Sequence, residues 1–417
     1  MLHAYGLLVL LAVPLALLRL LLRSIREPGY REDLAGRLGR GTAAAPGAVW
    51  IHGVSAGEIA SAAPLLDRLR TALPERPLLL TTTTATGRAR ARGDCGTFAE
   101  VAWLPFDHPV FVDAFLDARR PAALILVETE LWPVLIDRCR RRGIPVLLVS
   151  ARLSERSARG YARIAGLTEP MLASLSGVLC QDDASARRFR GLGARPEAVR
   201  VTGSLKFEPR VPDDLEDRVA SLRALLPPDR FLLVAASTHE DEERQLLSAF
   251  EAAGATRACL VLVPRHPQRF DAVWRRCARA GAARISDGPP PAETRVLLWD
   301  RMGDLFALCG AADLVFVGGS LVPRGGHNPI EAARHGTPVL VGPGAFNFEE
   351  VNARLAEGDG LVVVADAGEV MAELVRLQGE PALREARGRA AAEVVRASGG
   401  ALAATTEAVV AALPGVP

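Results

Sequence analysis

Acidic side chains at two places in the sequence have the spacing for acid–base chemistry. Glu58 ends the segment His52-Gly53-Val54-Ser55-Ala56-Gly57-Glu58, and Glu128 and Glu130 lie in Glu128-Thr129-Glu130-Leu131-Trp132-Pro133. A positioned carboxylate can take a proton from a hydroxyl group as that hydroxyl attacks. A serine three residues before a glutamate is also the spacing of a helix capping box. The sequence therefore leaves open whether Glu58 is a cap or a general base.

The carboxylates of Glu128 and Glu130 are expected at the end of a strand. Pro133 follows them and is predicted to stop that strand, because proline cannot donate to a sheet ladder. Strand residues two apart share a face only while the strand continues, so with the strand ending here the two carboxylates are predicted to lie on opposite faces. One of the two is then expected to point toward bound ligand.

Lys206 is the one lysine among the 50 basic residues, so the other 49 are arginine. It follows a strand pattern, in Gly203-Ser204-Leu205-Lys206-Phe207. An ammonium group is more compact than a guanidinium group, and its use in a chain that otherwise prefers arginine favours a tight site around a carboxylate or a phosphate. A lysine kept by chance on a solvated surface is the alternative.

Two more strand-to-helix junctions stand in the second half of the chain, at Ser237-Thr238-His239-Glu240 and Gly325-Gly326-His327-Asn328-Pro329-Ile330-Glu331. In each, Ser or Asn precedes Glu by three residues, which predicts a capping box, and the first junction is expected to be no more than that. The second has proline at the predicted first helical position, so its helix start is expected to bind a phosphate. Glu331 would then turn toward ribose hydroxyls, and Gly318-Gly319-Ser320 would let the backbone approach the ligand.

Composition excludes several classes of protein. The 417 residues are 49% hydrophobic, enough for two or three domains with full cores. A net charge of +2 gives no field for binding duplex nucleic acid, although a nucleotide-sized ligand stays possible. Six scattered cysteines indicate neither a zinc site nor a disulfide framework. No G-x-G-x-x-G follows a strand and no P-loop is present, which disfavours NAD and P-loop chemistry.

Short apolar runs alternate with amphipathic segments along the chain, which predicts an α/β fold whose strands and helices position these residues. The first series of predicted strands spans 48–53, 77–84, 101–106, 122–127, 145–150, 177–181 and 199–204. The second series spans 231–236, 259–264, 295–299, 314–317, 338–341 and 361–364. We predict two Rossmann-like lobes that face each other across a cleft, with ligands at the carboxyl ends of the strands.

The predicted boundaries are 1–26 for an anchor, 27–208 and 229–417 for the two domains, and 209–228 for a proline-bearing linker.

The N-terminal segment is the one membrane candidate. No charge occurs from Ala4 to Leu18, and the apolar run continues past Arg19 before the basic residues Arg23 and Arg26. A signal peptide would carry its positive charge before the run and a small-residue cleavage site after it. The opposite order predicts a retained anchor that lies in the membrane or crosses it, with the body of the protein on the cytoplasmic side.

Seven segments carry a resemblance to a known family. They are Val54-Ser55-Ala56-Gly57-Glu58, Glu128-Thr129-Glu130-Leu131-Trp132-Pro133, Ala151-Arg152-Leu153-Ser154, Thr202-Gly203-Ser204-Leu205-Lys206-Phe207, Ser237-Thr238-His239-Glu240, Val263-Pro264-Arg265-His266-Pro267, and Gly318-Gly319-Ser320 with Gly325-Gly326-His327-Asn328-Pro329. In this order, over nearly the whole chain, they resemble the 3-deoxy-D-manno-octulosonic acid (Kdo) transferases of Gram-negative bacteria. The resemblance implies a GT-B fold whose first domain binds the acceptor, the lipid A precursor lipid IVA at the inner membrane, and whose second domain binds the donor CMP-Kdo.

The matching motifs also imply roles for single residues. Glu58 is similar to the family's catalytic base, and Glu128 and Lys206 to residues that stabilise the transition state. The implied CMP-binding positions are Pro264, Arg265, Met302, Gly303, Asp304, Asn328, Pro329, Ile330 and Glu331. The chain departs from the family pattern at three positions, which are Asp304 for a more usual Glu, Gly53 for a common Ser, and Ala85 for a Pro.

The chemistry of such a donor fits this set of residues. CMP-Kdo is already activated, so the reaction needs one base for the acceptor hydroxyl and cationic or N–H groups for the departing phosphate. We expect a single displacement with inversion at the Kdo anomeric carbon, with no metal, no cofactor and no nucleic-acid partner. Two alternatives stay open, another nucleotide-sugar enzyme such as a UDP-sugar epimerase or a UDP-GlcNAc transferase, and a membrane-tethered two-lobe binding protein.

Overall fold

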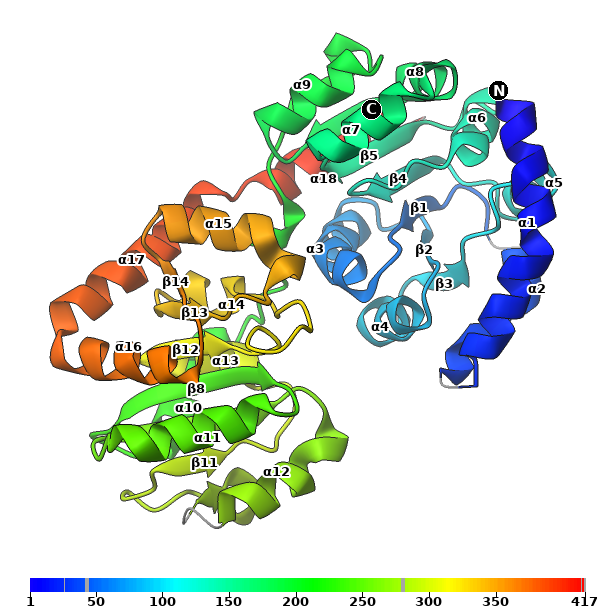
Figure 1. The fold of residues 1–417 in the computed structure, drawn as a ribbon. Coiled ribbons are helices and arrows are strands. Elements are labelled where there is room, and N and C mark those ends of the chain that lie inside the picture. The colour runs from blue at the N-terminus through cyan, green and yellow to red at the C-terminus, as the bar shows by residue number, and fades with distance from the viewer. Residues whose placement is uncertain (26, 42–44, 279–281, 414, 416–417) are drawn as a thin grey trace. The chain divides into compact units, whose positions relative to one another are not determined.

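The computed structural model describes residues 1–25, 27–41, 45–278, 282–413 and 415. The chain forms two compact units, which we call unit 1 (Met1–Arg210 with Gly399–Pro417) and unit 2 (Val211–Ser398). Each unit contains one seven-stranded sheet (Figure 1). Arg26, the last residue of the predicted anchor, lies outside the described residues.

The sheet of unit 1 has the strand order β3-β2-β1-β4-β5-β6-β7, and all its strand pairs are parallel. Its strands are β1 (Val49–His52), β2 (Leu78–Thr82), β3 (Glu100–Trp103), β4 (Ala123–Val127), β5 (Val146–Ala151), β6 (Gly177–Cys180) and β7 (Val199–Val201). The chain starts in the middle, builds one half outward, and returns to build the other half from β4. The order therefore reverses between β1 and β4, which is where open α/β sheets bind ligands.

Helices cover both faces of this sheet. They are α1 (Leu2–Arg23), α2 (Leu34–Arg37), α3 (Ala56–Ala72), α4 (Ala85–Cys95), α5 (Pro109–Arg119), α6 (Pro133–Arg141), α7 (Glu155–Ala162), α8 (Ala165–Ala173), α9 (Asp183–Gly191) and α18 (Ala401–Ala412). Neighbouring residues of β1 enter different cores, since Trp50 packs with residues of α5, α6, α8 and α9 whereas Ile51 packs with those of α3, α4 and α18. Burial on both faces explains why the strands are apolar without alternation.

The sheet of unit 2 repeats the plan in the order β10-β11-β9-β8-β12-β13-β14, again with parallel pairs throughout. Its strands are β8 (Phe231–Thr238), β9 (Ala258–Pro264), β10 (Ala283–Arg284), β11 (Val296–Leu298), β12 (Leu314–Val317), β13 (Val339–Val341) and β14 (Leu361–Val363). Its helices are α10 (Leu215–Leu225), α11 (Glu242–Ala253), α12 (Phe270–Cys277), α13 (Leu305–Ala311), α14 (Ile330–Arg334), α15 (Glu349–Glu357), α16 (Ala367–Gly379) and α17 (Pro381–Ala397). The strand order reverses between β8 and β12.

The structure confirms the predicted α/β class with parallel sheets, and every predicted strand is present with shifts of a few residues at its ends. The two-residue strand β10 was not predicted. Such a short edge strand carries too few residues to show an apolar pattern.

The end of the chain differs from the predicted boundaries. Residues 229–417 were expected to form one domain, but Gly399–Pro417 belongs to unit 1. Helix α18 buries Ala401 and Val409 in the core of unit 1, and Glu208 Oε1 accepts a hydrogen bond of 2.8 Å from Leu402 N. The predicted linker also contains α10, which is part of unit 2. A small apolar face on a terminal helix does not say which core it joins.

Candidate active site

In unit 1 the predicted catalytic residues gather at the reversal of strand order. Glu58 lies in the first turn of α3, directly after β1, and Glu128 and Glu130 follow β4, the neighbour of β1. Lys206 lies in the short 3₁₀ helix η3 (Leu205–Phe207), and its Nζ is 2.7 Å from Glu128 Oε1. The structure thus brings together all three residues that the sequence assigned to catalysis.

Glu58 caps its own helix. Ser55 Oγ accepts a hydrogen bond of 3.2 Å from Glu58 N, while Glu58 Oε1 accepts from Ser55 Oγ at 2.9 Å. The other carboxylate oxygen accepts from Val54 N at 2.7 Å. The capping box is therefore real, although its return bond goes to the residue before the cap. Since the cap contacts use the carboxylate without neutralising it, being a cap and being a base do not exclude each other.

The surroundings of Glu58 make its carboxyl a weaker acid than usual. Burial raises its pKa, and the charge of Glu128 raises the pKa further. The hydrogen bonds from Val54 and Ser55 and the charge of Lys206 act in the opposite direction without cancelling the effect of burial. A carboxylate with a raised pKa is a stronger base, which suits proton transfer from a sugar hydroxyl near neutral pH.

Glu130 is a second perturbed carboxyl in this cluster. Burial, followed by the charges of Glu58 and Glu128, raises its pKa to about 7. Its Oε2 accepts a hydrogen bond of 3.1 Å from Trp132 Nε1 and lies 4.0 Å from Nε2 of His52. Burial lowers the pKa of His52 to about 3, so this imidazole is neutral and forms no ion pair with Glu130.

The predicted placement of Glu128 and Glu130 on opposite faces of a strand is wrong. Strand β4 ends at Val127, before either residue, and Glu128 has the left-handed φ of 63°. This turn ends the alternation of strand side chains, so both carboxylates lie close enough to Glu58 to raise its pKa or to have their own raised by it. The three carboxyl groups therefore form one cluster, in which Lys206 pairs with Glu128 and its charge also acts on Glu58.

Unit 2 has a different cluster at its reversal of strand order. The rings of His239, after β8, and His327, after β12, are stacked with their Nε2 atoms 2.9 Å apart. Burial and the charge of Arg265 lower the pKa of His327 to about 3, and burial also lowers the pKa of His239. One neutral ring must donate to the other. Arg265 follows β9, and its backbone N donates to Thr238 O at 3.0 Å, which holds it beside these histidines.

A buried carboxylate that the sequence did not single out organises this region. Glu242 is fully buried and accepts hydrogen bonds from Gly319 N at 2.7 Å and from Ser320 N and Leu321 N at 3.0 Å. It also accepts from His239 N at 2.9 Å. Glu242 therefore fixes the glycine turn after β12 to the turn after β8.

The predicted capping box of Ser237 with Glu240 is wrong. Helix α11 begins at Glu242, two residues after Glu240, and its N-cap is Asp241. Ser237 has a φ of 54°, so the chain turns before the helix starts and the expected spacing is lost. The signal that the sequence did offer is the acidic pair at 242 and 243. Both residues are fully buried, and Glu243 pairs with Arg269 through two bonds of 2.7 and 3.0 Å.

Three other predicted CMP-binding positions, residues 302–304, follow the carboxyl end of a strand, as Arg265 does. Met302, Gly303 and Asp304 follow β11, the neighbour of β9, and Met302 is exposed. Asp304 Oδ1 is 3.0 Å from a guanidinium nitrogen of Arg218, and its Oδ2 accepts from Trp299 Nε1 at 3.3 Å. The carboxylate at the position that departs from the family pattern is therefore engaged within unit 2.

The start of α14 differs from its predicted form. Pro329 is the N-cap and Ile330 the first helical residue, so proline stands one position earlier than expected. Asn328 Oδ1 accepts a hydrogen bond of 3.1 Å from Ile330 N, which already uses one of the N–H groups of this helix start. Glu331 lies in the first turn. Among the residues that the structure describes, no group of His, Cys, Asp and Glu has the arrangement of metal ligands.

The fold and the two clusters define a class of protein. The chain is similar to a solved UDP-GlcNAc 2-epimerase from Neisseria meningitidis bound to UDP-GlcNAc, with a TM-score of 0.58 and 14% identity over 87% of this chain and 100% of that one. At this identity the likeness concerns the fold, which is of the GT-B class.

Sequence comparison gives the family within that class. Residues 32–209 match the family described as 3-deoxy-D-manno-octulosonic-acid transferase (kdotransferase). The chain is 36% identical over 407 residues to the 3-deoxy-D-manno-octulosonic acid transferase of Haemophilus influenzae, and 39% identical over 417 residues to that of Bordetella pertussis, with 95% of each chain covered in both cases. The protein belongs to the Kdo transferase family and is a glycosyltransferase, which confirms the resemblance seen in the sequence.

Proposed function

We propose that the protein transfers Kdo from CMP-Kdo to the lipid A precursor lipid IVA in lipopolysaccharide biosynthesis, at the cytoplasmic face of the inner membrane. The observation that carries this proposal is Glu58, a half-buried carboxylate with a raised pKa, beside the ion pair of Lys206 and Glu128. A base of this kind is what an already activated donor requires of the enzyme.

The proposed step is a single displacement with inversion and without a metal. Glu58 takes the proton from an acceptor hydroxyl, and the oxygen of that hydroxyl forms a bond to the anomeric carbon of Kdo. The bond from that carbon to the phosphate oxygen breaks, and CMP leaves with the electron pair. Lys206, held 2.7 Å from Glu128, offers positive charge near the base and opposes the repulsion among the three carboxyl groups.

We place the donor in unit 2. Arg265 would contact the phosphate of CMP, because it stands at the carboxyl end of β9 beside two histidines that the structure keeps neutral. Pro264, the turn 302–304 and the start of α14 at 328–331 would complete the nucleotide site. Their support is the position of the segments at the carboxyl ends of neighbouring parallel strands.

The direct test is incubation of the purified full-length protein in detergent with CMP-Kdo and lipid IVA, followed by mass spectrometry of the lipid. We expect a mass increase of one or more Kdo units that persists in the presence of a chelator. Transfer from a UDP-sugar but not from CMP-Kdo would contradict the proposed donor. Loss of transfer on chelation, restored by added metal, would contradict the proposed metal independence.

The donor site has its own test in Arg265→Ala. We expect CMP affinity to fall by about 1.5 to 3 kcal/mol, the range for a charge-assisted hydrogen bond, measured by calorimetry. Arg389→Ala is the matched control, because Arg389 is an exposed arginine on α17 whose partner is its helix neighbour Glu385. Equal CMP affinity in the two variants would remove Arg265 from the site.

A further inference from the structure

The burial pattern of α1 divides this helix into two faces. The residues that are buried or half-buried follow one another at helical spacing, and they are Leu2, Tyr5, Gly6, Val9, Val13, Ala16, Leu17, Leu20 and, directly after the helix, Ser24. Steps of three and four residues mark one side of an α-helix. Helix α1 therefore lies against unit 1 along its whole length and does not project from it.

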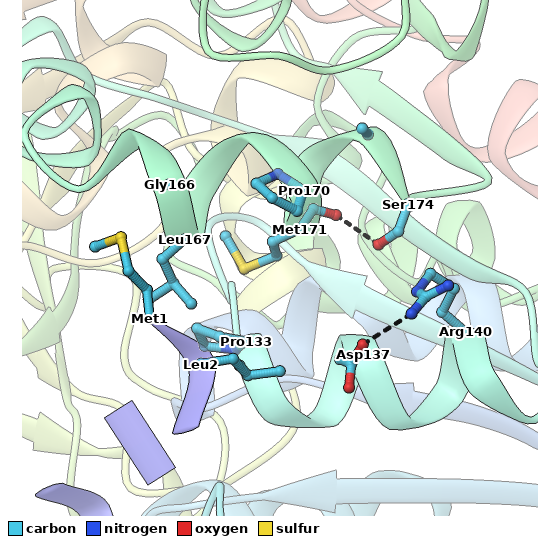
Figure 2. Close-up of a pocket in the computed structure, with 11 residues that line it drawn as sticks. Met1, Leu2, Pro133, Asp137, Arg140, Gly166, Leu167, Pro170, Met171 and Ser174 are labelled. Carbon is cyan, nitrogen blue, oxygen red and sulfur yellow. Dashed lines mark hydrogen bonds and ion pairs between the residues drawn. The ribbon is translucent and has the colours of Figure 1, made fainter. Parts of the chain in front are cut away.

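The N-terminal end of α1 is held by several contacts. Leu2 and Tyr5 pack against the core of unit 1, and Figure 2 shows Met1 and Leu2 beside Pro133 of α6 and the first turn of α8. The Tyr5 side chain also lies close to the buried carboxylate of Asp107, whose charge adds to burial in raising the pKa of Tyr5. Asp107 in turn accepts from Val134 N at 3.1 Å and Leu135 N at 2.7 Å, at the start of α6.

The C-terminal end of α1 is held as well. Ser24 is buried, and the guanidinium carbon of Arg23 lies 4.5 Å from the ring centre of Tyr30, which is also buried. Tyr30 belongs to the 3₁₀ helix η1 (Pro28–Arg31), which contacts α4. There Gly29 approaches so closely that a Cβ atom on it would lie 3.1 Å from Cβ of Ala85.

The opposite face of α1 is apolar and uncovered. It carries eight leucines that are 42 to 70% exposed, which are Leu7, Leu8, Leu10, Leu11, Leu15, Leu18, Leu21 and Leu22. A single soluble protein rarely exposes a continuous apolar surface of this extent. Arg19 and Arg23 are the charged residues of the helix, both near its C-terminal end. Cations at the edge of an apolar surface suit the anionic head groups of a membrane better than a second apolar protein surface.

We propose that α1 lies in the plane of the cytoplasmic leaflet, with its leucine face in the acyl region and its other face docked on unit 1. Length does not decide between this arrangement and a membrane span, because 22 residues reach about 33 Å and a bilayer core is about 30 Å thick. Docking does decide, because a spanning helix needs one end on the far side of the membrane, whereas both ends of α1 contact the same unit.

Unit 1 cannot follow a docked α1 through the bilayer. Beside α1, helix α5 carries Asp113 and Asp117, which pair at 2.7 and 3.0 Å with Arg142, the C-cap residue of α6. Such charged surface does not enter hydrocarbon without a large free-energy cost. A spanning α1 would therefore have to leave unit 1, lose the packing of Leu2 and Tyr5 on the core, and expose its docked face.

The first test locates the N-terminus. A short hydrophilic tag with one cysteine is fused ahead of Met1 of the full chain, and spheroplasts are treated with a membrane-impermeant maleimide before and after lysis. All six native cysteines are buried, so the background is low. We expect labelling only after lysis, as for the control Glu155→Cys, an exposed position on α7. Labelling of the tag in intact spheroplasts, where the control stays unlabelled, would overturn the proposal.

The second test probes the leucine face. We expect the full-length double variant Leu8→Glu with Leu15→Glu to lose at least tenfold in binding to phosphatidylethanolamine–phosphatidylglycerol vesicles, with its thermal unfolding unchanged. Val201→Glu, at an exposed apolar residue of β7, should bind as the wild type does. Undiminished binding of the double variant would overturn the proposal. So would a wild-type dimer without lipid that the double variant converts to monomer, since a second copy would then cover this face.

The inference rests on the inner-membrane location in the proposed function. Its tests can fail while the test of Kdo transfer succeeds, and the reverse. Labelling and vesicle binding need no donor, no acceptor and no turnover. The transfer reaction in detergent, in contrast, does not depend on how α1 meets a bilayer.

Discussion

Two helices of this protein, α3 and α16, begin with the same cap in different surroundings. The carboxylate of Glu58 accepts a hydrogen bond from Val54 N at 2.7 Å, and that of Glu369 accepts one from Ala365 N at the same distance. In both helices the donor belongs to the residue before the N-cap. Glu369 is exposed, whereas Glu58 is half-buried beside Glu128 and Lys206. Cap geometry therefore does not indicate a catalytic role. Burial and neighbouring charged groups distinguish Glu58 from Glu369.

Glu242 in unit 2 is a third carboxylate to compare with Glu58. It is more deeply buried than Glu58, yet four backbone N–H groups hold its carboxylate. A carboxylate whose lone pairs are taken by fixed donors stabilises a fold and has little capacity left to accept a proton from substrate. Burial raises the pKa of both Glu242 and Glu58, so a raised pKa alone does not distinguish the base. The catalytic candidate is thus the partly buried carboxylate, which has fewer fixed donors than Glu242.

The largest effect is expected from Glu58→Gln. The amide can keep both cap contacts, because its oxygen accepts from Val54 N and its NH₂ group can donate to Ser55 Oγ. Loss of the base should lower the rate of Kdo transfer about 100-fold to 10,000-fold, measured as initial rates at saturating CMP-Kdo.

Glu369→Gln is the matched control for this substitution, since it removes the same charge from the same kind of cap. It should keep wild-type turnover and unfold within a few tenths of a kcal/mol of the wild type. Glu58→Gln should be at least as stable as the wild type at neutral pH, because it removes a carboxyl whose pKa is raised in the fold. Turnover above about a tenth of wild type in Glu58→Gln would make Glu128 the next candidate for the base.

Glu242→Ala tests the structural side of the comparison. It leaves the N–H groups of His239 and of residues 319–321 without their acceptor, so we expect a loss of about 3 to 5 kcal/mol in the free energy of unfolding. Glu369→Ala, at an exposed cap, should lose about 1 kcal/mol. Urea unfolding measures both, and equal losses would show that the buried carboxylate does not organise this region.

Glu130→Gln sharpens the comparison through pH. In the fold the pKa of Glu130 is raised to about 7, above its ordinary value of 4.5, so the folded chain binds more protons in that window and stability falls as the pH rises through it. Glutamine removes this penalty and can still accept from Trp132. The variant should match the wild type at pH 4.5, and at pH 8.5 its free energy of unfolding should exceed that of the wild type by about 3 kcal/mol, measured by thermal unfolding. A constant difference across pH would contradict the raised pKa.

The smallest effect is a shift of the acid limb of kcat/KM. Lys206→Met removes a charge that lowers the pKa of Glu58, so the limb should move to higher pH. Glu128→Gln removes a charge that raises the same pKa, so the limb should move to lower pH. The double variant should return toward the wild-type position. Shifts in the same direction for both single variants would separate Glu58 from this limb.

Much of the fold could be predicted because parallel strands buried on both faces read as apolar runs. All predicted strands are present, whereas their order within each sheet, and with it the point where the order reverses, comes from the structure. The destination of α18 could not be predicted. Its buried face is small and apolar, and such a face fits either core until the chain is folded.

The candidate site was predictable where residues are close in sequence. Ser55 and Glu58 form a contact within one helical turn, so their spacing alone indicates it. The shared position of Glu128 and Glu130 was not predictable, because it depends on the left-handed φ of Glu128 after β4. Glu242 was missed because three of its four hydrogen-bond donors lie 77 to 79 residues further along the chain.

The sequence by itself determined the α/β class, the positions of the strands along the chain, the catalytic candidates and the apolar character of residues 2–22, since each depends on residue type and local spacing. Only the tertiary structure decided which carboxylates are held by hydrogen-bond donors or paired with cations, because these partners come from distant segments. It also decided that α1 rests against unit 1, because the side of an apolar helix that becomes buried depends on the surface it meets.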